Sequence, residues 1–269
     1  MTFDVPANVL PSRKFRNTTL FLLATVAILF CSAAYLRVDP TSFSTDLHYV
    51  RELAADMFPP NLQLIWRKRG LVKSLFETVS MAFLGTFFGG CVALVLAFFA
   101  ATNVSPSPRL RMVVRALLAA ERSLPSFVVL LVLLIAVGIG PFAGMLSLSI
   151  GSIGMFGKLF ADAIEQADKG IFESIQSVGG TKLQLIRYAI LPEVVPSFIA
   201  NLFYAFDVNL RAAIPLGVFG GGGIGFEFDF ADRLLRYKDM LAYGLIIIVL
   251  ITGMERLSDS VRRRLLSHQ

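Results

Sequence analysis

Charged residues are scarce in this chain. Asp, Glu, Lys and Arg make up only 16% of its 269 residues, whereas hydrophobic residues make up 55%. A soluble domain usually carries about a quarter charged residues. Because so little charge cannot cover a protein surface in water, lipid must form part of the solvent. The composition therefore predicts an integral membrane protein.

Reactive and metal-binding side chains are also few. The two cysteines, Cys31 and Cys91, lie inside apolar stretches and form no CxxC spacing, and the two histidines, His48 and His268, lie outside those stretches. We therefore expect neither a disulfide framework nor a metal site. No HExxH, Ser–Lys or Cys–His grouping brings a nucleophile to a base, which argues against a membrane enzyme.

Long apolar runs are what the sequence has instead. Six of them, each near the roughly 20 residues that a membrane helix needs, lie at 18–36, 75–101, 124–140, 142–163, 193–216 and 240–255. They predict an all-α polytopic protein with about six transmembrane helices. The first run follows Arg13, Lys14 and Arg16, as in a signal peptide, but its length exceeds the typical 7–15 residues, so we expect an uncleaved helix.

Basic residues flank these runs, which is a topology signal and not a sign of nucleic-acid binding. With the N-terminus inside, cytoplasmic segments, including 109–122, hold fourteen Lys and Arg and outside segments hold nine. Both termini are therefore expected in the cytoplasm. The outside cluster at 66–69 fits an interfacial helix with Trp66 at the headgroups. We expect an N-terminal segment, 1–74, with the first transmembrane helix and this outer segment, and a transmembrane domain, 75–265.

The segment 165–192, between the fourth and fifth runs, has the pattern of two short amphipathic helices. Ile171 and Ile175 mark one apolar stripe, Gly179 and Gly180 break it, and a second stripe ends at Pro192. Helices this short cannot span a membrane. They either lie on its surface as an interfacial hairpin or dock to a partner.

This segment resembles the EAA loop of ABC-importer permeases, through Glu173, Gly179 and the pair Leu191 and Pro192. Ser174 and Ile175 replace the two alanines of that pattern. Three wider stretches resemble one branch, the phosphonate-transport permeases, and with the loop the resemblance covers about 75–265. The stretches are 153–160 (IGMFGKLF), 204–213 (YAFDVNLRAA) and 220–226 (GGGGIGF).

The resemblance implies a type I importer fold in the bacterial inner membrane, with cytoplasmic coupling helices between the fourth and fifth spans. It implies a permease homodimer, or a pair with a paralogous permease, a periplasmic solute-binding protein, and cytoplasmic ABC ATPase subunits that hold ATP and Mg²⁺. No cofactor would be bound by this chain. The residues that would contact the ATPase are Glu173, Gly179, Gly180, Leu191 and Pro192.

The substrate that the resemblance implies is a phosphonate or a related phosphorus oxyanion such as phosphite or hypophosphite. A permease for another small solute, such as methionine, is an alternative because related permeases share the coupling loop. A secondary anion transporter is a second alternative. That class usually has internal repeats and an acidic relay, and here only Asp207 is a well-placed buried acid.

Four polar residues within or at the ends of spans are candidates for the translocation pathway: Asp207, Asn209, Arg211 and Lys158. Charge at bilayer depth usually faces protein or water. Asp207 and Arg211, spaced i and i+4, are able to form a structural ion pair, and Lys158 is able to snorkel to the interface. The functional alternative places Arg211 on the route of an anion.

A glycine cluster follows the fifth span, with Gly220, Gly222 and Gly225 in G-x-G-x-x-G spacing. A dinucleotide site needs a preceding strand and an acidic residue roughly 20 positions later, and neither is expected here. Together with Gly221 and Gly223, these glycines predict a flexible outer turn or gate.

Overall fold

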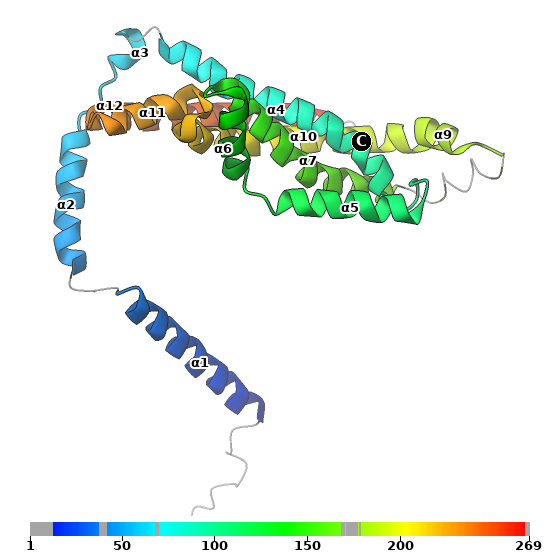
Figure 1. Ribbon diagram of the computed structural model, residues 1–269, viewed down its shortest axis with the longest axis horizontal. Helices are drawn as coiled ribbons and strands as arrows, with labels where there is room; N and C mark the ends of the chain where they lie inside the picture. Colours follow the sequence, from blue (N-terminus) through cyan, green and yellow to red (C-terminus); the bar gives the residue numbers. More distant parts are fainter. Residues whose placement is uncertain are drawn as a thin grey trace, which may run out of the picture. The chain divides into compact units, whose positions relative to one another are not determined.

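The computed structural model describes residues 13–37, 42–67, 70–167, 170, 177 and 179–266, and every regular element in this part is a helix (Figure 1). The α-helices are α1 (Arg13–Tyr35), α2 (Ser42–Met57), α3 (Leu64–Arg67), α4 (Gly70–Ala100), α5 (Pro108–Arg122), α6 (Ser126–Val137), α7 (Pro141–Gln166), α9 (Lys182–Leu185), α10 (Leu191–Leu216), α11 (Gly223–Arg233) and α12 (Tyr237–Leu266). Two π-helical turns are η1 (Ile186–Ile190) and η2 (Gly217–Gly221). The predicted all-α class is confirmed.

The chain divides into two units between Ala55 and Asp56. The first unit holds α1 and most of α2, and α1 contains an apolar stretch, Asn17–Tyr35, of 19 residues. The second unit holds the remaining helices. Its first long helix, α4, begins at Gly70, five residues before the expected start of the transmembrane domain.

Within the described residues, five helices are long and apolar enough to cross a membrane. They match five of the six expected spans: α1, α4, α7, α12 and the helix that begins with α10. The third expected span, 124–140, is different. Its helix α6 has only 12 residues, about 18 Å at 1.5 Å per residue, which is too short for a hydrocarbon core of ~30 Å. It meets α5 at an angle of 89°.

The third crossing is made by α5 and α6 together. A Cβ added at Gly85 or Gly89 of α4 would meet Leu148 and Ser152 of α7 in turn, so the two helices run parallel in close contact. Parallel neighbours in a membrane require the chain between them to return across it. The segment 109–122, expected in the cytoplasm, therefore forms part of this crossing.

Local sequence explains where α5 starts and why the chain bends after it. Ser107 caps α5 by accepting a hydrogen bond from the Leu110 N–H at 3.2 Å, and Pro108 occupies the first turn, where its missing N–H is tolerated. Pro125 precedes α6 in an extended conformation. Since the residue before a proline avoids the helical region, the helix cannot run straight from α5 into α6.

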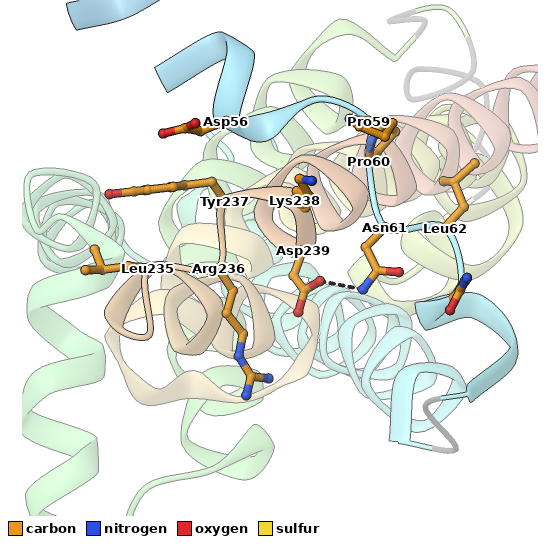
Figure 2. Close-up of a pocket in the computed structure, with 11 residues that line it drawn as sticks. Asp56, Pro59, Pro60, Asn61, Leu62, Leu235, Arg236, Tyr237, Lys238 and Asp239 are labelled. Atoms are coloured by element: carbon orange, nitrogen blue, oxygen red, sulfur yellow. Dashed lines mark hydrogen bonds between the residues drawn. The ribbon is translucent and has the colours of Figure 1, made fainter. Parts of the chain in front are cut away.

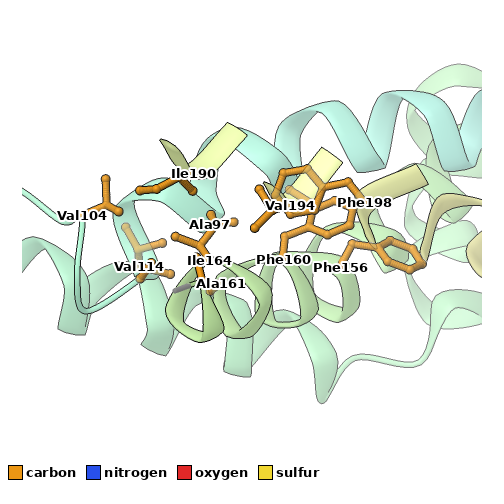
Figure 3. Packing of buried hydrophobic residues seen from close by; sticks show 14 of the residues in the cluster. Ala97, Val104, Val114, Phe156, Phe160, Ala161, Ile164, Ile190, Val194 and Phe198 are labelled. Atoms are coloured by element: carbon orange, nitrogen blue, oxygen red, sulfur yellow. The ribbon is translucent and has the colours of Figure 1, made fainter. Parts of the chain in front are cut away.

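The largest buried cluster of the described residues packs around the carboxyl-terminal halves of α4 and α7 (Figure 3). Phe156 and Phe160 of α7 pack with Phe198 of α10, and the ring centroids of Phe160 and Phe198 are 4.6 Å apart. The cluster continues to Val104, in the connection between α4 and α5. This cluster therefore joins α4, α5, α7 and α10 into one body.

Candidate functional site

The coupling segment is described in its second half. Glu173 and most of the first expected helix lie outside the described residues. Gly179 has φ +76°, a left-handed conformation that favours glycine. The Thr181 N–H donates to Oε1 of Gln184 at 2.8 Å, and the Gln184 N–H donates to Oγ1 of Thr181 at 3.4 Å. This reciprocal capping box starts α9 directly after the glycine turn.

Pro192 does not end the second helix, contrary to expectation. Instead α9 continues through η1 into α10, and the Leu191 N–H donates to the carbonyl of Ile186 in the wider π pattern. A proline lacks an N–H, and its ring crowds the carbonyl four residues earlier, here that of Tyr188. A π turn at this point accommodates Pro192 without breaking the helix.

The base of this long helix is anchored in the core. Leu185, Ile190 and Val194 are 5%, 0% and 3% exposed and belong to the cluster around Phe160 (Figure 3). The glycine turn at 179–180 lies beyond this anchored part. A force applied to α9 would therefore reach α10 and its neighbours through packed side chains.

Asn209 holds three helices together. Its side-chain amide donates to Oγ1 of Thr86 on α4 and to Oγ of Ser152 on α7, both at 2.8 Å. The two hydroxyls in turn donate to the backbone carbonyls of Ala82 and Leu148. Asn209 is 7% exposed, so its geometry is that of a structural cross-link, and its pathway role stays a prediction.

The expected pair of Asp207 with Arg211 is not formed. The Arg211 guanidinium lies 2.8 Å from the Glu255 carboxylate, because α12 packs beside α10 and carries this longer acid to it. Asp207 has one buried carboxylate oxygen, Oδ1, that accepts no hydrogen bond from any described residue. The pathway role of Asp207 and Arg211 stays a prediction, and Glu255 is a partner that sequence spacing could not reveal.

Lys158 lies apart from these groups. It lines a cleft between α5 and α7 together with Arg115, Arg122 and Asp162. Asp207, Asn209 and Arg211 are not among the residues that line this cleft.

The glycine cluster forms a compact turn after α10. The Gly140 N–H donates to the carbonyl of Gly220 at 3.0 Å, and a Cβ at Gly222 would lie 2.8 Å from the Pro141 ring. The turn is also tied to α4, since the Ile224 N–H donates to Oγ1 of Thr78 at 2.9 Å and the Gly223 N–H to Oε2 of Glu77 at 3.3 Å. The gate role stays a prediction, and no sequence signal pointed to Glu77 or Thr78.

A surface cleft lies where the segment before α3 meets the turn between α11 and α12 (Figure 2). Asn61 holds the two segments together. Its backbone N–H donates to the carbonyl of Lys238 at 3.1 Å, and its side-chain amide donates to Asp239 at 2.8 Å. By the expected topology this cleft faces outside.

The described part of the chain is all-helical and crosses the membrane several times. One of its helices, which runs from α9 through η1 into α10, begins at a glycine turn and is anchored in the core. These features are typical of a transport component. The family description "Binding-protein-dependent transport system inner membrane component" matches residues 93–267. The chain belongs to this family, and it is a multi-pass membrane protein and a transport component.

Two permeases are among the relatives that resemble most of the chain. The phosphite transport system permease protein PtxC of Stutzerimonas stutzeri is 34% identical over 238 residues, which cover 88% of this chain and 85% of PtxC. The phosphate-import permease protein PhnE of Mycolicibacterium smegmatis is 40% identical over 227 residues, 84% of this chain and 42% of PhnE. These relatives place the chain in the phosphonate-type branch of the ABC permeases.

A solved structure with the same fold is the MetNI methionine ABC transporter in an inward-facing conformation. The match has a TM-score of 0.64 with 22% identity and covers 75% of this chain and 97% of that one. The expected type I importer permease fold is confirmed.

Proposed function

We propose that this chain is the permease subunit of an ATP-driven importer for a phosphorus oxyanion such as a phosphonate, phosphite or hypophosphite. Two permeases, identical or paralogous, form the pathway in the inner membrane. Separate ATPase subunits in the cytoplasm bind ATP and Mg²⁺, and a periplasmic binding protein delivers the solute. The named functions of the relatives at 34% and 40% identity support this substrate class.

The observation that carries the coupling mechanism is the unbroken helical path from Lys182 to Leu216. Its exposed start follows a glycine turn, and its base is buried at Leu185, Ile190 and Val194. Short, stiff helical elements transmit rigid-body motion. A partner that binds 173–192 on the cytoplasmic side is therefore able to move α10 and, through the packed cluster around Phe160, α4 and α7.

The orientation follows from the same assignment. The cytoplasmic side holds the coupling segment, the 101–107 connection and both termini. The outer side holds the glycine turn at 220–225, which acts as the gate. Anchoring of that turn by Glu77 and Thr78 supports a closed outer end in this structure.

The coupling role of the helical path from Lys182 to Leu216 is tested by lowering its helix propensity without removing core contacts. Arg187 and Tyr188 are exposed in η1, and glycine at both positions weakens a helix by about 1–2 kcal/mol in total. In the assembled importer, Arg187→Gly with Tyr188→Gly is expected to abolish stimulation of ATP hydrolysis by the loaded binding protein while leaving assembly intact.

The matched control is Thr252→Gly with Arg256→Gly, two exposed positions on α12. This pair softens a helix outside the lever and should retain stimulation. Equal loss in both double variants, or full stimulation in the η1 variant, would contradict the lever. Uptake that needs no ATP would instead favour a secondary transporter.

A further inference from the structure

Helix α5 lies alongside α7 and runs antiparallel to it. Leu118 meets Gly157, and the Glu121–Arg122 end of α5 meets Gly154, while Arg115 pairs with Glu165 near the end of α7. Gly154 is at the middle of the 26-residue helix α7. Arg122 is therefore level with the centre of a helix that spans the membrane.

Four arginines and one acid make α5 strongly basic, and the exposed residues Arg115 and Arg122, seven positions apart, share one face of it. A guanidinium at mid-membrane depth that faced lipid would be several kcal/mol unfavourable by most estimates. This face must therefore be turned to water or to protein. In a transporter, the water-filled alternative is the pathway.

Within the described residues, Arg122 and Lys158 are cations without a close ion pair. Neither forms an ion pair within 4.0 Å with any residue in the described part of the chain, whereas Arg115 is held by Glu165 and donates through Nε to the carbonyl of Ala100 at 2.8 Å. Both cations line the cleft between α5 and α7, and the adjacent Glu121 carboxylate interacts electrostatically with Arg122. Asp162 is the acid that shares its lining.

The cleft has room for a small solute. Its volume is about 240 Å³, several times the ~30 Å³ that one water occupies. Ala119 and Ala161, two short side chains, also line it. A cleft with low-dielectric walls and several cationic side chains raises the local concentration of anions.

We propose that this cleft is an oxyanion-binding station within the pathway, where Arg122 and Lys158 hold the transported phosphorus oxyanion on its way to the cytoplasm. The proposal rests on the proposed function. A phospholipid headgroup carries the same phosphate chemistry, but headgroups lie at the membrane surface and Arg122 lies at mid-depth. Arg115, nearer the cytoplasmic end, provides the next cation along the same face.

The test uses the complete importer, with its ATPase and binding protein, in vesicles with phosphite and methylphosphonate as probes. Arg122→Gln and Lys158→Gln are each expected to raise the apparent KM for uptake about tenfold, the effect of ~1.4 kcal/mol of lost attraction. Lys158→Arg, which keeps the charge, should retain uptake. Arg109→Gln, on the same helix but outside the cleft, is the matched control and should match the unaltered chain.

A second variant acts in the opposite direction. Asp162→Asn removes the acid of the cleft and is expected to lower the apparent KM for uptake several-fold. This variant keeps the proposal testable even if the glutamine variants do not assemble. An unchanged KM in Asp162→Asn, or equal effects of Arg109→Gln and Arg122→Gln, would overturn it.

Two further outcomes are distinguishable. Effects confined to vesicles with phosphatidylglycerol, and absent in phosphatidylcholine alone, would assign the cleft to a lipid headgroup and overturn its assignment to the solute. No ATP-driven uptake of either probe by the unaltered importer would overturn the proposed function, and with it the station. Normal uptake by the unaltered chain and by both glutamine variants would overturn the station alone.

Discussion

The contact between α4 and α7 provides a sharp quantitative test of the fold, through Gly89→Ala. A Cβ at this position would lie 2.5 Å from the Ser149 carbonyl oxygen and 2.6 Å from Cβ of Ser152. Carbon–oxygen contacts are comfortable at about 3.3 Å or more, so the helices must separate locally by nearly 1 Å. The separation also stretches the bond that Ser152 accepts from Asn209.

The expected change in stability is the difference between two effects. Forcing an extra methyl group into a packed contact costs about 1–3 kcal/mol, whereas alanine gains about 0.5–1 kcal/mol over glycine inside a helix. Gly89→Ala should therefore destabilise the chain by about 1–2 kcal/mol. Gly253→Ala on α12, where no atom of the chain lies within 4 Å of the added Cβ, should show the helix gain alone.

Thermal unfolding of the two purified variants measures this difference. At 2–4 °C per kcal/mol, a rate calibrated on soluble domains of similar size, Gly89→Ala should melt roughly 3–12 °C below Gly253→Ala. A Gly89→Ala variant that melts at or above its control would refute the close α4–α7 contact, and with it the argument that α5 and α6 form the return crossing.

Two further substitutions separate structural from transport roles. Asn209→Ala should lower the free energy of unfolding by about 1–2 kcal/mol. Uptake per assembled complex should be unchanged, because Thr86 and Ser152 still donate to backbone carbonyls. Lost uptake at an unchanged melting temperature would contradict a purely structural role for Asn209. Arg211→Ala should lower uptake without loss of assembly, measured against Glu255→Gln, which frees the guanidinium and should retain uptake. Equal losses in these two variants would assign the pair a structural role only, and uptake by Arg211→Ala at the level of the unaltered chain would remove Arg211 from the pathway.

Much of the fold follows from hydropathy alone. The apolar runs at 75–101 and 142–163 correspond to α4 and α7, because an uninterrupted helix of this length satisfies its backbone groups within lipid. The run at 124–140 predicts one span, but its helix α6 has only 12 residues and lies at 89° to α5. Average hydropathy carries no information on the direction of a helix, so it could not reveal this bend. Pro125 signals a break, but the 89° turn depends on how Ser126 packs against α7, where Oγ of Ser147 donates to its carbonyl at 2.6 Å.

The candidate site was predictable only where its signal is local. The glycine turn at 179–180 and the helix after it follow from periodicity and capping residues. The partner of Arg211 and the anchoring of the outer turn by Glu77 depend on contacts between helices far apart in sequence. Sequence spacing within one helix carries no information on such contacts, which is why Asp207 was assigned to Arg211 in place of Glu255.

The central claim is that this chain forms an ATP-driven pathway for a phosphorus oxyanion. The most direct measurement is uptake of phosphite and methylphosphonate into vesicles that contain the chain with its ATPase and binding protein, with methionine as a competitor. The account predicts uptake that requires ATP and the binding protein and that excess methionine does not reduce. Uptake without ATP, or uptake of methionine in preference to both phosphorus compounds, would contradict it.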